Sequence, residues 1–167
     1  MKYFKHKPSK KSDVYLTPQC FANRIIDHFN PSGRVLEPCA GPGLEGGYIQ
    51  NDIFTDWCEI TEGKDFLEWN EQVDWIITNP PYSIVGLIIE HALTVSQNIV
   101  IAPVMAHKWF GHGKLHKMLR AEGWGFKECV WHDRPPAPFP KLGWQFCALH
   151  LEKGHESPMI WTDWRAK

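Results

Sequence analysis

Asn79-Pro80-Pro81-Tyr82 is the segment whose residue types and order point most directly to chemistry. It follows an apolar run at residues 73–78, which predicts a buried strand that ends at Asn79. The prolines fix the backbone, so the Asn79 amide oxygen and a proline carbonyl can together accept both hydrogens of one planar NH₂ group. Tyr82 offers a flat face for a base taken out of its stack. A proline turn with an asparagine cap is the structural alternative.

A glycine-rich segment, Glu37–Gly43, follows the predicted strand at residues 34–37. Glycine lets the backbone approach a ligand closely and turn toward the next element. The segment has neither the G-x-G-x-x-G of a dinucleotide site nor the Gly-Lys-Ser/Thr of a phosphate-binding loop, which argues against those ligands. An ordinary strand-to-helix turn is the alternative to a ligand site.

Two acids lie at the end of the second predicted strand, at residues 56–60, and shortly after it. A carboxylate at Glu59 can accept hydrogen bonds from both hydroxyls of a ribose. Asp65 can bind the amino group of an adenine while the backbone at Phe66 reaches a ring nitrogen. Taken singly, each acid is typical of a solvated surface. Together with the glycine segment, they indicate an adenosine site.

The elements that position these motifs alternate between apolar runs and helical patterns, which is typical of βαβ units around a parallel sheet. In such a sheet, ligands bind beyond the carboxyl ends of the strands, where all three motifs fall. Thr17 is expected to cap the first helix, with Pro18 at its first position. The other expected elements are strands at 98–102, 126–131 and 144–150, helices at 84–95 and 112–122, and a helical turn or edge strand at 66–69. One loop joins the last two strands, which predicts that they are antiparallel.

The motifs resemble, in type and order, those of the class I S-adenosylmethionine-dependent methyltransferases, and among them the DNA methyltransferases that modify N6 of adenine. The resemblance covers roughly the first 85 residues directly. It implies an α/β, Rossmann-like fold: a mostly parallel seven-stranded sheet with one antiparallel strand near the edge and helices on both faces. S-adenosyl-L-methionine is the implied cofactor.

The resemblance also implies roles for the residues at matching positions. Asp13–Pro18 resembles the segment that holds the methionine part of the cofactor. The implied cofactor-binding residues are Tyr15, Thr17, Pro18, Glu37, Pro38, Cys39, Ala40, Gly41, Gly43, Glu59, Asp65, Phe66 and Asn79. The implied catalytic residues are Asn79, Pro80, Pro81 and Tyr82.

Two loops at the same carboxyl edge, residues 105–114 and 132–141, mix basic residues with aromatic ones. This mixture suits phosphate contact combined with base stacking, although core packing explains Trp109, Phe110 and Phe139 equally well. The chain has no room for a separate target-recognition domain, which predicts short or relaxed sequence specificity, or specificity supplied by a partner, for example through a homodimer. The candidate substrate-binding residues are Lys108, Trp109, His112, Lys114, Arg134 and Lys141.

The composition fits one domain, assigned to residues 13–167, with a net charge of −1. Residues 1–12 form a basic arm that contains five lysines and no acid before residue 12. We expect this arm to be flexible, and either to contact the phosphates of double-stranded DNA or to be merely solvated.

Scattered cysteines, the lack of an apolar core behind the N-terminal charges, and the lack of a run near ~20 apolar residues favour a cytoplasmic protein without a membrane partner. No metal site is predicted, since no cysteine pair has metal-finger spacing. His107, His112 and His116 also lack an accompanying carboxylate motif.

Three further functions remain open. An RNA adenine methyltransferase or a protein glutamine methyltransferase uses the same tetrapeptide, because the acceptor is again a planar nitrogen. The third is a non-catalytic nucleic-acid-binding module on the same fold, against which the intact motifs at Glu59, Asp65 and Asn79 argue.

Overall fold

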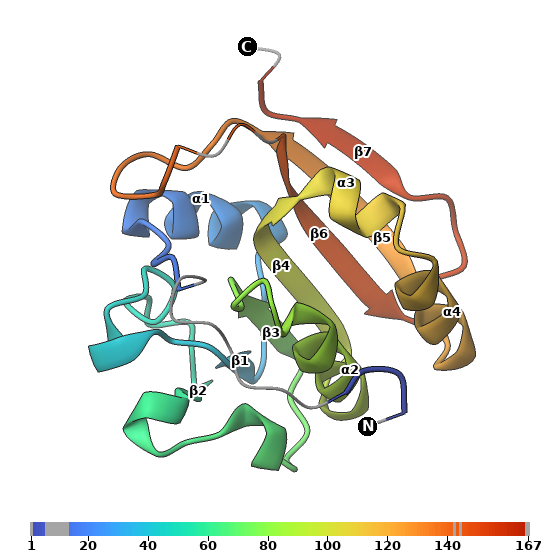
Figure 1. The fold of residues 1–167 in the computed structure, drawn as a ribbon, viewed down its shortest axis with the longest axis horizontal. Helices are drawn as coiled ribbons and strands as arrows, with labels where there is room; N and C mark the ends of the chain where they lie inside the picture. The colour runs from blue at the N-terminus through green and yellow to red at the C-terminus, as the bar shows by residue number, and fades with distance from the viewer. Residues whose placement is uncertain (1, 6–13, 142, 144, 166–167) are drawn as a thin grey trace.

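The central feature of the computed structural model is one sheet in the order β2-β1-β3-β4-β6-β5-β7 (Figure 1). The structure describes residues 2–5, 14–141, 143 and 145–165, except for the side chains of residues 107 and 108. The strands are β1 (Val35–Glu37), β2 (Asp56–Trp57), β3 (Trp75–Thr78), β4 (Asn98–Met105), β5 (Trp124–His132), β6 (Phe146–Lys153) and β7 (Ile160–Asp163).

Strand direction follows the expected pattern. β6 is antiparallel to both of its neighbours, β4 and β5, whereas every other neighbouring pair of these strands is parallel. The prediction of a mostly parallel seven-stranded sheet with one antiparallel strand near the edge is therefore confirmed. β5 and β6 are antiparallel because a loop alone connects them.

Helices cover both faces of the sheet, as predicted. Successive strand residues point to opposite faces, so Val35 and Ile77 pack toward α1 (Gln19–Phe29), whereas Leu36 and Ile76 pack toward the other helices. Burial on both faces explains why these strands read as continuous apolar runs. The helices on the second face are α2 (Val85–Val95), α3 (Ala106–Phe110) and α4 (Gly113–Ala121).

The first helix starts one residue later than predicted. Pro18, not Thr17, is its N-cap residue, and the Pro18 carbonyl accepts from Phe21 N and Ala22 N at 3.0 Å each. Thr17 is buried, and its carbonyl oxygen accepts from Gly47 N at 2.9 Å. The prediction was wrong because this contact takes Thr17 out of the helix.

Short 3₁₀ turns, rather than long helices, connect the first three strands. They are η2 (Pro42–Leu44), η3 (Ile60–Glu62) and η4 (Phe66–Glu68). The second strand ends at Trp57, short of the predicted residue 60, because the Glu59 side chain caps the η3 turn by accepting from Thr61 N at 3.1 Å. The element expected at residues 66–69 is a helical turn and not an edge strand.

One α-helix and one strand were not predicted. The segment 105–114 was expected to be a loop, but it contains α3, in which Trp109 is buried against the core. β7 was missed because it is short and largely exposed, so it lacks an apolar pattern. The predicted strand at 144–150 is observed from Phe146, and Trp144 lies outside the described residues.

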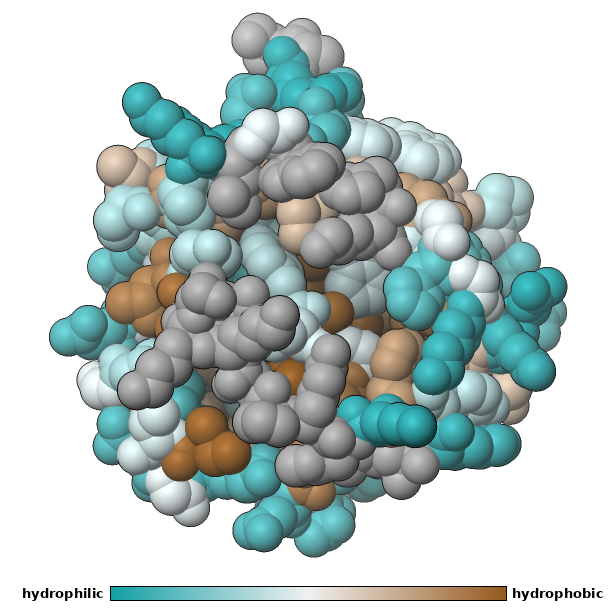
Figure 2. Space-filling model, in the orientation of Figure 1, coloured by the Kyte–Doolittle hydropathy of each residue, from teal (hydrophilic) through white to brown (hydrophobic). Residues whose placement is uncertain are grey.

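The surface on the side shown in Figure 2 carries hydrophilic side chains around its margin, with apolar side chains between them toward the middle. Nowhere in the described part of the chain does a helix have both the length and the apolarity needed to cross a bilayer.

Gly47 marks a close approach between the turn after β1 and the start of α1. A Cβ atom at this position would lie 2.4 Å from Thr17 O and 2.7 Å from Gln19 N, both of which are backbone atoms. Backbone on both sides cannot give way as a flexible side chain would. The turn that follows the glycine-rich segment is therefore held against the N-terminal end of α1.

We expect Gly47→Ala to lower the free energy of unfolding by about 1–3 kcal/mol or more, since overpacking forces backbone shifts. Urea unfolding measures the change. Gly113→Ala is the matched control, because a Cβ there meets no atom within 4 Å. Equal stability of the two variants would contradict the close approach at Gly47.

Candidate functional site

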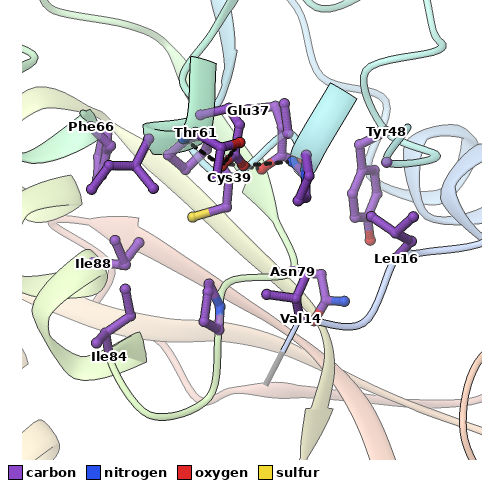
Figure 3. A pocket seen from close by; sticks show the side chains of 18 of the residues that line it. Val14, Leu16, Glu37, Cys39, Tyr48, Thr61, Phe66, Asn79, Ile84 and Ile88 are labelled. Carbon is purple, nitrogen blue, oxygen red and sulfur yellow. Dashed lines mark hydrogen bonds between the residues drawn. The ribbon is translucent and has the colours of Figure 1, made fainter. Parts of the chain in front are cut away.

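A pocket lies at the carboxyl ends of β1, β2 and β3 (Figure 3). Five chain segments form its wall: Val14–Thr17, the loop after β1, the turns after β2, the segment Asn79–Pro81 after β3, and the first turns of α2. All of the predicted cofactor-binding residues line it, apart from Pro18 and Gly43. The fold therefore brings together motifs that lie far apart in the sequence, such as Tyr15 and Asn79, which are separated by 64 positions.

Glu59 ties the loop after β1 to the turn after β2. Its Oε2 accepts from Gly41 N at 2.9 Å, and its Oε1 accepts from the Thr61 hydroxyl at 2.9 Å. Gly41 has a φ of +84°, a conformation that glycine adopts without strain. Because Oε2 has a second lone pair, Glu59 can still accept from a hydroxyl group of a ligand.

Glu37 is a buried carboxyl group at the end of β1, with an exposed fraction of 2%. Its Oε1 accepts from Cys39 N at 2.9 Å. Burial raises the pKa of Glu37 to about 8, and the nearby charge of Glu59 adds to the increase. The Glu37 carboxyl is therefore neutral over much of the physiological range, and a cationic group beside it would favour its ionised form.

Asp65 and Phe66 line the pocket at the start of the η4 turn. Asp65 Oδ1 accepts from Leu67 N at 2.9 Å, which fixes the direction of the carboxylate. The Phe66 ring is buried and packs edge-on against His91, with 4.8 Å between ring centroids. Because the first N–H groups of a helical turn have no partner within the turn, the Phe66 N–H is placed to donate to a ligand.

Asn79 is oriented by one hydrogen bond. Its Nδ2 donates to Tyr15 O at 2.8 Å. A carbonyl oxygen can only accept, so this contact sets which side of the amide faces Tyr15. The amide oxygen is then the group that can accept hydrogen bonds from a ligand. Pro81 also lines the pocket, whereas Pro80 is buried and is not among the lining residues.

A second cavity, of about 480 Å³, adjoins this pocket. Ile84 and Leu87, at the start of α2, line both. The second cavity brings Tyr82 together with three predicted substrate-binding residues, which are Trp109, His112 and Lys114.

The remaining predicted substrate-binding residues do not gather at these cavities. Arg134 and Lys141 are exposed on the loop after β5 and line neither one. The Lys108 side chain lies outside the described atoms. Phe139 on the same loop is buried against Met105 and Phe146, so it packs in the core.

Tyr82 contacts two other segments of the chain, at Pro103 and at Tyr15. Its hydroxyl donates to Pro103 O at 3.4 Å, and its ring centroid lies 6.1 Å from that of Tyr15. The Tyr15 ring also lies 5.9 Å from that of Phe139. Aromatic packing therefore supports Tyr82 from the segment that lines the first pocket.

Several residues of the two cavities were not predicted from the sequence. Tyr48 lines the first pocket, is 2% exposed, and donates its hydroxyl to Ala102 O at 2.8 Å. Ile84 and Ile88 form an apolar wall of the same pocket (Figure 3). Phe4 and Lys5 line the second cavity. The apolar side of α2 was recognisable in the sequence, but nothing showed that it would face a ligand.

Among the described residues, no group of three histidine, cysteine, aspartate or glutamate side chains is placed to hold a metal ion.

Comparisons with known proteins identify the fold. No family model and no curated protein sequence matches the chain. The structure is similar to a Listeria monocytogenes protein assigned as a class I S-adenosylmethionine-dependent methyltransferase, with a TM-score of 0.61, 12% identity, and coverage of 89% of this chain and 65% of that one. It is also similar to a Pyrococcus horikoshii protein assigned as an RNA methyltransferase, with a TM-score of 0.60, 17% identity, and coverage of 91% and 93%.

A third similar structure is a modification subunit assigned to a type I restriction enzyme of Vibrio vulnificus, with a TM-score of 0.59, 13% identity, and coverage of 92% of this chain and 47% of that one. The chain thus spans less than two thirds of the Listeria protein and about half of the Vibrio subunit. At these identities the similarity shows the fold, which is that of class I S-adenosylmethionine-dependent methyltransferases.

We expect Glu37→Gln to change how stability depends on pH. The unfolded state releases the Glu37 proton near pH 4.5, whereas the folded state retains it up to about pH 8. The wild-type free energy of unfolding therefore falls across this window, by at most about 1.4 kcal/mol per pH unit from this group, and levels off above it.

Urea unfolding of both proteins at several pH values from about 5 to 9 measures the effect, since this range spans the window between the two pKa values. The difference between the proteins isolates Glu37, because buried His150, whose pKa is lowered to about 4 by burial, titrates alike in both. Parallel curves for wild type and Glu37→Gln would contradict the raised pKa.

Proposed function

We propose that this chain is an S-adenosylmethionine-dependent methyltransferase that methylates the N6 amino group of adenine in DNA. The observation that carries the proposal is the position of Asn79, whose amide is oriented by Tyr15 and lines the first pocket, while Tyr82 of the same tetrapeptide lines the adjoining cavity. One cavity has the groups that an adenosine cofactor needs, and the other has aromatic and basic groups that suit a nucleotide.

The first pocket fits the cofactor in the chemistry of its lining. Glu59 can accept from ribose hydroxyls, and Asp65 with the Phe66 N–H can bind the edge of an adenine. Ile84 and Ile88 form an apolar wall for the base. Glu37 and the segment Val14–Thr17, which line the same pocket, would hold the amino-acid part. When bound, S-adenosylmethionine would supply an electrophilic methyl group.

The acceptor amino group would be held by the catalytic tetrapeptide. The Asn79 amide oxygen and the Pro80 carbonyl accept its two hydrogens and direct the nitrogen lone pair toward the first pocket. Tyr82 stacks on the extruded base. These hydrogen bonds strengthen as the nitrogen becomes tetrahedral, which stabilises the transition state more than the ground state. Positioning supplies much of the remaining effect.

DNA is the favoured polymer, and RNA is the second candidate. The similarity to a modification subunit of a restriction enzyme supports DNA. The similarity to the Pyrococcus protein assigned as an RNA methyltransferase supports RNA, because the matched region covers 91% of this chain and 93% of that one. Methylation of a protein glutamine and a non-catalytic role are less favoured, because neither uses the aromatic and basic lining of the second cavity together with the tetrapeptide. A homodimer stays a prediction.

Incubation with labelled cofactor and unmethylated DNA, RNA and protein in parallel tests the proposal directly. We expect label in DNA, recovered as N6-methyldeoxyadenosine after digestion to nucleosides. Label in RNA alone would transfer the proposal to RNA. Calorimetry that detects no cofactor binding would instead favour the non-catalytic module.

We expect Asn79→Ala to lower kcat by about 100-fold or more, by analogy with the loss of one preorganised transition-state hydrogen bond. Single-turnover methylation measures the change. Asn23→Ala on the exposed side of α1 is the matched control and should retain wild-type kcat. Full activity of Asn79→Ala would refute the mechanism.

We also expect short or relaxed sequence specificity, because the described elements that line the second cavity, where a sequence would be read, are short segments. Methylation of duplexes of randomised sequence, followed by sequencing of the modified sites, measures it. Dominance of one long recognition site would contradict this expectation.

A further inference from the structure

The N-terminal residues Lys2–Lys5, which we call the N-terminal strap, are held against α2 by Glu90 (Figure 1). Glu90 Oε1 accepts from Lys2 N and, at 2.8 Å, from Tyr3 N, and its Oε2 accepts from Phe4 N at 2.8 Å. Glu90 is only 8% exposed. A carboxylate at such a site needs hydrogen-bond partners, and the strap provides three in succession. These residues of the predicted basic arm are thus docked, whereas Lys7, Lys10 and Lys11 lie outside the described residues.

Phe4 bridges the two sides of the second cavity. Its ring lies directly on Gly86 of α2, where a Cβ atom would be 2.3 Å from Phe4 Cε1. On its other side, the ring centroid is 6.0 Å from that of His112 and 4.6 Å from Lys114 Nζ. Phe4 therefore closes the gap between the first turn of α2 and the segment that begins α4.

We propose that the N-terminal strap is a substrate-recognition element in which Phe4 forms an aromatic wall of the acceptor cavity and holds Lys114 at its mouth, so that the cavity accepts a nucleotide of a polymer. This inference rests on the proposed function and concerns the same site. Glu90 is the positioning residue, because it acts on the acceptor only by fixing the strap.

The side chains around the cavity explain why a nucleotide is the occupant. Phe4, Tyr82 and Trp109 present aromatic surface, on which any base can stack. Lys5 and Lys114 are exposed at the same cavity and can contact backbone phosphates. The amide of a protein glutamine has neither a ring nor a phosphate, so it would leave both sets of groups unused.

The test compares Phe4→Ala with Tyr3→Ala in the full chain. Both remove a half-buried ring from the strap, but only Phe4 lines the cavity. We expect Phe4→Ala to raise the KM for DNA by about 5- to 150-fold, the range for loss of one base–aromatic contact, with an unchanged Kd for the cofactor. Tyr3→Ala should leave the KM close to that of wild type, because the Tyr3 ring does not line the cavity.

Gly86→Ala provides a second measurement that does not remove the ring. Its methyl group would displace Phe4, so the KM for DNA should rise although alanine favours the helix. In the Phe4→Ala background the same change should have no further effect, which is the non-additivity expected of two residues in contact.

The outcomes separate the two proposals. If wild type is active and Phe4→Ala, Tyr3→Ala and Gly86→Ala share its KM for DNA, the role of Phe4 is overturned and the proposed function stands. If wild type binds the cofactor but methylates no nucleic acid, the proposed function fails, and this inference fails with it.

Glu90→Gln, which weakens the anchor of the strap, should also raise the KM for DNA at an unchanged cofactor Kd.

Discussion

Parallel pairing of β1 with β2 on one side and β3 on the other is the constraint on which the site depends. Leu36 is the register partner of Asp56 in β2 and of Ile76 in β3. Because the three strands run side by side in one direction, the residues that follow them arrive at the same edge of the sheet. For this reason one pocket is lined by Glu37, Glu59 and Asn79, although the chain between them folds largely as turns.

Hydrogen bonds made by side chains then hold the loops that follow these strands. Glu59 joins the loops after β1 and β2 through Gly41 N and Thr61. Asn79 joins the end of β3 to the segment at Tyr15. Each contact satisfies a polar group that would otherwise be costly at a buried or half-buried site, and each also fixes the direction of a group that faces the pocket. The same side chains therefore stabilise the loops and line the pocket.

The sequence predicted what depends on local pattern and missed what depends on distant contacts. The apolar runs at 73–78 and 98–102 identified β3 and β4 because both of their faces are buried. The position of Asn79 directly after β3 followed from the first of these runs. The start of α1 was shifted by the contact of Thr17 O with Gly47 N, and the docking of the strap on Glu90 joins residues 86 to 88 positions apart. No periodicity in a single sequence records such pairings.

β7 has a consequence for how the sheet behaves toward other molecules. β5 is nine residues long and would be the outermost strand without the chain that follows β6. β7 pairs with its second half, and the preceding loop covers Gly125, where a Cβ would lie 2.1 Å from His155 O. None of the described residues 154–165 lines either cavity. Their physical effect is to replace a long open strand, the kind of edge at which sheets of separate molecules join and aggregate, with a short one that ends at the Asp163–Arg165 ion pair.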